Sequence, residues 1–151
     1  MSELKSTLTW MRESADFSYD TYNREHSWSF DGGEVIKASA SPAYKGNPSC
    51  VDPEETLVAA VSSCQMLTFL ALAAKKRFIV DSYTDEAVGI LEKDADGKLA
   101  ITRISLNPRI GFSGEKKPSQ EKLHQLCEAA HEHCFIASSI KSEVQIKPEK
   151  L

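Results

Sequence analysis

The sequence predicts an α+β fold in which two main helices pack on antiparallel sheets. Three observations lead to this prediction. One long apolar segment has clear helix start and stop signals, turn sequences of the Asp-Gly type interrupt or join strand-like runs, and the segments follow in the order strands, helix, strands, helix, strand. Because the chain has 151 residues and no internal repeat or linker, we expect a single domain over residues 1–151.

The N-terminal third is expected to contain strands and a long loop. Residues 7–12 and 27–37 are strand-like, and the Asp-Gly-Gly sequence at 31–33 breaks the second run as a hairpin turn would. Residues 39–52 are rich in Ser, Pro, Gly and Asn, which is typical of a loop.

A long helix is predicted over residues 53–76. Asp52 can cap it, Pro53 suits the first helical position, and Glu55 completes a capping box of the form D-x-x-E. The basic residues 75–77 lie at the negative end of the helix dipole. The signals at the start and at the end of the segment therefore predict the same helix.

The C-terminal half is expected to alternate strands and a second helix. The helix has leucine, cysteine and alanine on one stripe, and the last strand alternates polar and apolar residues as an edge strand does. The expected segments are strands at 82–93 and 98–110 joined by a turn at 94–97, a loop at 109–118, a helix at 119–133 and a strand at 142–146.

Composition and charge exclude several functions. The 18 basic and 22 acidic residues give a net charge of −4 without any basic block, so we expect no nucleic-acid partner and no polybasic membrane anchor. Residues 57–74 approach the length of a membrane span, but they include four polar side chains, and we expect a buried central helix instead. The first residues do not resemble a secretory signal, so we expect a cytoplasmic protein whose four cysteines are free thiols.

Cys64 is the first candidate for chemistry. It lies in the middle of the long helix, on the same expected apolar face as Val61 and Leu67, and it could simply be a small core residue. Burial would raise its pKa, so a reactive Cys64 needs a cation from elsewhere in the fold. The candidate cations are Arg12, Arg24, Arg77, Arg103 and Arg109, and composition does not choose among them.

Cys134 follows the second helix and allows two interpretations. If the fold brings it to Cys64, the two thiols could perform peroxide chemistry through a sulfenic acid and a disulfide. Alternatively, His124, Cys127, His131 and Cys134 recur on roughly one helix face and include metal-ligand residue types. The compact spacings of well-defined zinc sites are absent, as are nucleotide-binding and serine-hydrolase motifs.

The motifs around both cysteines resemble the OsmC/Ohr family of osmotically inducible and organic hydroperoxide resistance proteins. The first motif runs from Val-Asp-Pro-Glu-Glu at 51–55 to Ser-Ser-Cys at 62–64, and the second is the segment 131–141 around Cys134. The segment 22–33, Tyr-Asn-Arg-Glu-His-Ser-Trp-Ser-Phe-Asp-Gly-Gly, is similar to one OsmC-like branch. The resemblance covers about residues 5–147.

This resemblance implies thiol-dependent reduction of organic hydroperoxides to alcohols. Cys64 would be the peroxidatic thiol, Cys134 the resolving thiol, and Glu54 the glutamate that holds an arginine near the thiolate. The Gly-Arg-Asp-Gly motif of the hydroperoxide-resistance branch is absent, and Arg24 is the arginine that matches the other branch. A dithiol such as dihydrolipoamide or a lipoylated protein would reduce the disulfide, and no metal or other cofactor is expected.

The spacing on the long helix adds a geometric constraint. Glu54 and Cys64 are ten residues apart, which is about 15 Å along a helix axis. A neighbouring chain could therefore supply the carboxylate, which fits the family's intertwined homodimer. We further expect apolar residues such as Trp28, Phe69 and Phe135 to line the substrate pocket. The alternative function is a noncatalytic, small-molecule-binding or stress-associated dimer with vestigial thiols.

Overall fold

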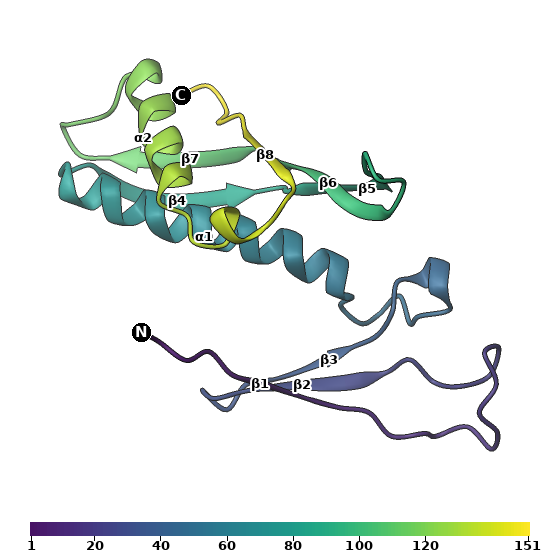
Figure 1. Cartoon of the computed structure of the whole chain (residues 1–151). Coiled ribbons are helices and arrows are strands. Elements are labelled where there is room, and N and C mark those ends of the chain that lie inside the picture. Colours follow the sequence, from purple (N-terminus) through teal and green to yellow (C-terminus); the bar gives the residue numbers. More distant parts are fainter. The chain divides into compact units, whose positions relative to one another are not determined.

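The computed structural model describes all residues 1–151 and has the α+β composition expected from the sequence (Figure 1). The chain divides into two compact units, residues Met1–Thr56 and Leu57–Leu151. The expectation of a single domain stays a prediction.

The first unit contains a three-stranded antiparallel sheet. Its strands are β1 (Ser6–Thr9), β2 (His26–Phe30) and β3 (Val35–Ala38), in that spatial order. The expected hairpin at 31–33 is confirmed, and Gly33 adopts a φ of 89° that a residue with a side chain would resist. The predicted first strand at 7–12 is too long. From Trp10 onward the chain leaves the sheet, and the Trp10 indole donates to the carbonyl of Asn23 at 2.8 Å.

The loop from 39 to 52 is tightly folded. Buried Ser39 accepts a hydrogen bond at its hydroxyl from the amide of Asn47, at 3.0 Å, and its own amide donates to the carbonyl of Val51. A short 3₁₀ turn, η1 (Pro42–Tyr44), lies inside this loop. These hydrogen bonds bring the end of β3 beside the start of the long helix.

The long helix α1 spans Pro53–Lys75, one residue shorter than predicted. The expected capping box is present, because the Glu55 amide donates to Asp52 Oδ1 at 2.8 Å and the Asp52 amide donates to Glu55 Oε2 at 3.4 Å. The helix ends where Arg77 adopts a φ of 60° and the amide of Phe78 donates to the carbonyl of Ala73.

The second unit contains two small sheets, which corrects the predicted pair of long strands. The observed strands are β4 (Ile79–Asp85), β5 (Val88–Lys93), β6 (Leu99–Leu106), β7 (Pro108–Ser113) and β8 (Glu143–Ile146). β4 pairs with β7, and β5 pairs with β6. The runs at 82–93 and 98–110 are therefore each divided between two sheets, and the predicted loop at 109–118 begins as strand β7.

Both strand-like runs are divided at one shared corner, where residues 22 positions apart in the sequence form a hydrogen bond. Asp85 accepts a hydrogen bond from the amide of Asn107 at 2.7 Å and another from the hydroxyl of Ser62 at 2.5 Å. Pro108, which has no amide hydrogen, then starts the next strand. The corner therefore interrupts both runs, and each run forms two separate strands.

The second helix and the last strand agree with the expected positions. α2 spans Gln120–Glu132 and begins after Ser119, whose hydroxyl accepts from the amide of Lys122 at 3.2 Å. A 3₁₀ turn, η2 (Ala137–Ser139), follows it. β8 pairs with β6 in the parallel direction.

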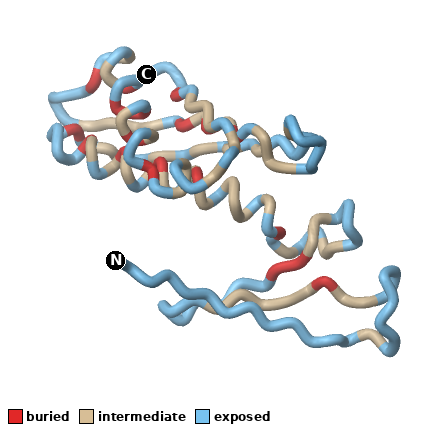
Figure 2. The backbone as a smooth tube through the Cα atoms, in the orientation of Figure 1, coloured by how far each residue is buried: buried red, intermediate tan, exposed pale blue.

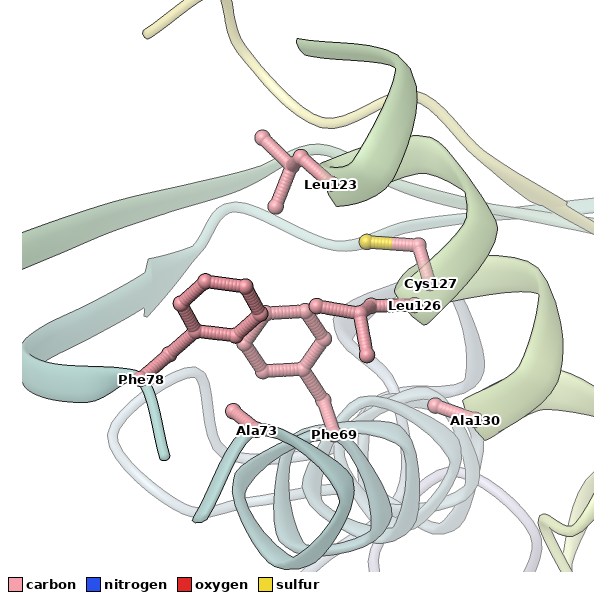
Figure 3. Close-up of a cluster of buried hydrophobic side chains, with 7 residues drawn as sticks. All are labelled: Phe69, Ala73, Phe78, Leu123, Leu126, Cys127 and Ala130. Atoms are coloured by element: carbon pink, nitrogen blue, oxygen red, sulfur yellow. The ribbon is translucent and has the colours of Figure 1, made fainter. Parts of the chain in front are cut away.

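The core of the second unit lies between α1, α2 and the sheets. Figure 3 shows side chains of α1 and α2 directed toward one another, and Figure 2 shows buried positions recurring along one side of α1. The buried residues of α1 are Val61, Gln65, Phe69 and Ala73. By length and composition α1 would also be able to cross a membrane, but this stripe packs inside the unit.

We expect Gly46→Ala to destabilise the protein. A Cβ at this position would lie 1.5 Å from the carbonyl oxygen of Ala40, so the backbone must shift, and overpacking of this kind costs about 1–3 kcal/mol or more. The measurement is the free energy of unfolding in urea. The control is Gly32→Ala, because a Cβ at Gly32 meets nothing within 4 Å and should change stability by less than about 0.5 kcal/mol. Equal stability of the two variants would contradict the observed packing of the loop.

Candidate functional site

The structure brings the thiols of Cys64 and Cys134 together. Cys64 lies in the middle of α1 and is half-buried, whereas Cys134 is buried and follows α2. The Cys134 thiol forms a hydrogen bond with Cys64. Two residues seventy positions apart in the sequence thus form one pair, as peroxide chemistry would require.

The surroundings of Cys64 favour its thiolate. Burial raises the pKa of Cys64, but hydrogen bonds from the Cys134 thiol and from the main-chain amides of Ile136 and Phe135 outweigh burial, and the net pKa is below the ordinary value. Hydrogen-bond donors around a sulfur stabilise negative charge there. These donors lie within the second unit, and the expectation that an arginine also lowers this pKa stays a prediction.

The surroundings of Cys134 have the opposite effect. Burial raises its pKa, and so does the hydrogen bond to Cys64, since that bond requires Cys134 to keep its proton. The amide of Ala137 donates to the Cys134 sulfur at 3.4 Å and opposes this rise without cancelling it. The pair is therefore asymmetric, with Cys64 as the acceptor and Cys134 as the donor.

One turn supplies the donors to both sulfurs. After α2 the chain passes through Cys134 into η2, where Ser138 donates its amide and its hydroxyl to the carbonyl of Cys134, both at 3.1 Å. The main-chain amides of residues 135–137 donate to the sulfurs of the two cysteines. These donors could not be predicted from the sequence, because no residue type marks a main-chain amide that donates to a side chain.

The face of α1 expected for Cys64 requires a correction. Leu67, predicted on the buried face, is 60% exposed, whereas Val61, predicted on the same face, is buried together with Gln65. Gln65 is almost fully buried and donates its side-chain amide to the carbonyl of Cys127 at 2.9 Å. This bond ties α1 to α2 beside the thiol pair.

The remaining cysteines lie outside the pair. Cys127 belongs to the core shown in Figure 3, where burial raises its pKa to about 12, so its thiol stays protonated. Cys50 is half-buried in the loop of the first unit. No group of three or more His, Cys, Asp or Glu side chains is placed to hold a metal ion, so the stripe at 124–134 does not form such a cluster.

Arg24 belongs to the first unit and is held in place there. Its guanidinium is buried, donates to the carbonyls of Tyr22 and Tyr19, and stacks 3.6 Å from the centre of the Tyr22 ring. His26 Nδ1 lies 2.8 Å from the carbonyl oxygen of Arg24, within hydrogen-bond distance. The indole of Trp28 donates to His26 Nε2, also at 2.8 Å. Because a carbonyl only accepts, this geometry makes Nδ1 of His26 the donor.

Glu54 is half-buried at the start of α1, and its neighbour Glu55 closes the capping box. Neither Arg24 nor Glu54 forms an ion pair in this structure. The expected Glu54–Arg24 pair is thus not made within this unit.

The expected pocket residues belong to different units, with Trp28 in the first and Phe69 and Phe135 in the second. Phe69 is fully buried in the core of the second unit. Phe135 is 83% exposed, and Trp28 is engaged with His26.

Comparison with known proteins identifies the family. The model of the OsmC-like protein family matches residues 46–149, which include both thiols and Glu54. The chain belongs to this OsmC-like family. An OsmC-like protein of unknown function from Vibrio cholerae is 47% identical, with a TM-score of 0.96 over 99% of this chain and all of that one. The family resemblance inferred from the sequence is therefore confirmed.

More distant relatives share the fold. An organic hydroperoxide resistance protein from Elizabethkingia anophelis has a TM-score of 0.75 at 16% identity, over 100% of this chain and 98% of that one. The hydroperoxide resistance protein OhrB of Bacillus subtilis has a TM-score of 0.66 at 21% identity, over 99% and 98%. The uncharacterised protein YmaD of Bacillus subtilis is 22% identical over 84% of this chain and 85% of its own length.

We expect Cys64 to be the fastest thiol to react with iodoacetamide at neutral pH. Its lowered pKa gives it a larger thiolate fraction than Cys134 or Cys127, whose pKa values are raised. The measurement is the pH dependence of alkylation at each cysteine, read by peptide mass spectrometry. Cys134→Ala should move the Cys64 midpoint to higher pH because it removes a donor, whereas Cys50→Ser should not move it. Faster alkylation of Cys134 than of Cys64 would contradict the assigned asymmetry.

Proposed function

We propose that this OsmC-like protein is a thiol-dependent peroxidase that reduces organic hydroperoxides to alcohols. The observation that carries the proposal is the asymmetric thiol pair, in which Cys64 favours the thiolate and Cys134 keeps its proton. Such a pair has a nucleophile and a proton donor in contact, as reduction of an O–O bond requires. The shared fold with organic hydroperoxide resistance proteins supports the same choice of substrate.

The first step oxidises Cys64. Its thiolate attacks the distal oxygen of the hydroperoxide, so an S–O bond forms and the O–O bond breaks. The alkoxide leaves and takes a proton, which the Cys134 thiol can supply, to become the alcohol. Cys64 is then a sulfenic acid, and Cys134 is a thiolate.

The second step resolves the sulfenic acid. The Cys134 thiolate attacks the Cys64 sulfur, a disulfide forms and hydroxide leaves. A dithiol reductant, dihydrolipoamide or a lipoylated protein, then restores both thiols and is itself oxidised to a disulfide. This cycle needs no metal or organic cofactor, and it suits the reducing cytoplasm.

Arg24 and Glu54 have supporting roles in this proposal. The guanidinium of Arg24 stabilises negative charge on the departing alkoxide, and Glu54 of a second copy of the chain holds the guanidinium in place, since the two groups form no ion pair within one chain. The buried and fixed position of Arg24 is consistent with this role, because a guanidinium cannot lose its charge.

The active form in this proposal is a homodimer with two composite sites. α1 carries Glu54 and Cys64 ten residues apart, so one helix cannot place both at the same point. Only 22% of the apolar window of α1 is buried in the single chain and Leu67 is 60% exposed, so a second copy of the chain could cover more of this helix.

We expect the protein to consume cumene or tert-butyl hydroperoxide with dihydrolipoamide as the reductant. Cys64→Ser should reduce turnover on the order of 10³-fold or more, because the nucleophile is lost. Cys134→Ser should still allow one oxidation of Cys64 but not its recycling through a disulfide. Cys50→Ser serves as the matched control and should retain full activity. If the folded protein with free thiols shows no turnover with any dithiol, the enzyme proposal fails and a noncatalytic binding role is favoured.

We expect a mixed dimer of Glu54→Gln and Cys64→Ser chains to recover activity. Each parent homodimer should be strongly impaired. In a composite arrangement, however, the mixed dimer pairs one intact Cys64 with the intact Glu54 of the other chain. Its activity should be about half that of the native dimer, measured on doubly tagged dimers whose mass is verified by light scattering. A monomeric protein, or a mixed dimer as inactive as its parents, would rule out the composite site.

A further inference from the structure

The residue that follows Cys64 is a buried amide. Gln65 is 1% exposed and belongs to the buried stripe of α1, where a polar side chain needs hydrogen-bond partners. Its Nε2 donates to the carbonyl of Cys127 at 2.9 Å, and Cys127 lies on α2 and faces the core (Figure 3). A hydrogen bond between residues 62 positions apart thus begins directly beside the proposed nucleophile.

Two consecutive residues of α1 therefore hold α2 and the turn after it at two points. Cys64 accepts a hydrogen bond from the Cys134 thiol, and Gln65 donates to Cys127, which lies seven residues before Cys134. Seven residues correspond to about two helical turns, or about 10 Å along a helix axis. Successive side chains of a helix point about 100° apart, so the two contacts act in different directions. Together they restrict both sliding and rotation of α2 on α1.

Tyr83 on β4 supplies a second buried polar group near Cys127. Its ring packs on Phe69, one helical turn after Gln65, with ring centres 5.8 Å apart. Burial raises the pKa of Tyr83, so its hydroxyl keeps its proton, and Cys127 lies within electrostatic reach of it. The Tyr83 hydroxyl and Gln65 Oε1 are both buried without a partner in the chain, one a donor and the other an acceptor. One water between them would satisfy both groups.

We propose that Gln65 is a positioning residue for the thiol pair, which holds α2 against α1 so that the Cys134 thiol stays on Cys64, and that one buried water links Gln65 to Tyr83. All of these residues belong to the second unit. Gln65 acts through the position of Cys134 and takes no part in bond making. Its role in position is independent of any turnover, whereas its effect on hydroperoxide reduction rests on the proposed function.

The protonation of Cys64 reports on this position. Burial raises the pKa of Cys64, and the hydrogen bond from Cys134 is the largest opposing contribution. The amides of Ile136 and Phe135 and the side chain of Thr68 lower the same pKa by less. A shift of α2 on α1 lengthens the bond from Cys134, so the pKa of Cys64 rises and its thiolate fraction at neutral pH falls.

The test compares the pH dependence of Cys64 alkylation by iodoacetamide in the native protein and in Gln65→Met, read by peptide mass spectrometry. Methionine has nearly the size of glutamine but no amide. We expect the midpoint of Gln65→Met to move to higher pH and its alkylation rate at neutral pH to fall by about threefold to tenfold, as the weakening of one hydrogen bond implies. Tyr83→Phe keeps the ring and removes only the hydroxyl, so it should move the midpoint in the same direction by less.

The matched control is Phe78→Leu, which removes apolar volume from the same core without removing a polar group. It should lower the thermal midpoint of unfolding and leave the pH midpoint of Cys64 alkylation unchanged. An equal pH shift in Phe78→Leu, or no shift in either Gln65→Met or Tyr83→Phe, would overturn the positioning role. An unchanged midpoint in Tyr83→Phe alone would overturn the water bridge. If Gln65→Met does not fold, Tyr83→Phe against Phe78→Leu carries the test.

Hydroperoxide kinetics separate this inference from the proposed function. In the proposed peroxidase, kcat/KM of Gln65→Met for cumene hydroperoxide should fall by the same factor at neutral pH and return to the native value at higher pH, where Cys64 is ionised in both proteins. An equal loss at every pH would contradict positioning through Cys134. A shifted alkylation midpoint in Gln65→Met, with no turnover even in the native protein, would support the positioning role and overturn only the peroxidase.

Discussion

The hydrogen bond between Cys134 and Cys64 is the interaction on which the difference between these two thiols depends. It assigns different roles to two identical side chains, because the donor must keep its proton while the acceptor gains stability as an anion. Without it, only weaker donors would oppose burial, which raises the pKa of Cys64. The turn after α2 strengthens this difference through the amides of Phe135 and Ile136.

The scaffold around the pair holds these groups at fixed positions. Gln65, next to Cys64, is tied to the carbonyl of Cys127 in α2, so the two helices cannot slide past each other without breaking a buried hydrogen bond. Asp85 similarly holds Ser62, two residues before Cys64, at the corner where the two sheets separate. The thiols thus meet because the elements that carry them are fixed by neighbouring residues.

Local signals predicted the parts of this structure that local interactions determine. The capping pair Asp52 and Glu55 located the start of α1, and the turn at 31–33 located the first hairpin. The prediction of two continuous strands at 82–93 and 98–110 was wrong, because their common corner depends on a hydrogen bond between residues 22 positions apart. The buried face of α1 was predicted only in part, with Val61 buried and Leu67 exposed, because a helix that is apolar on most sides has no periodicity that identifies its core face. The pairing of Cys64 with Cys134 was expected from their motifs, but the donors of the turn were invisible in the sequence.

The contact between the two sulfurs also bears on how far oxidation of this protein can proceed. A sulfenic acid whose resolving thiol is distant can react with a second oxidant molecule and become a sulfinic acid, which ordinary dithiols do not reduce. Here the partner thiol is already beside Cys64, and capture within one molecule is favoured over any encounter in solution. In the proposed cycle, a surge of hydroperoxide would therefore leave the protein as a recoverable disulfide and would not inactivate it permanently.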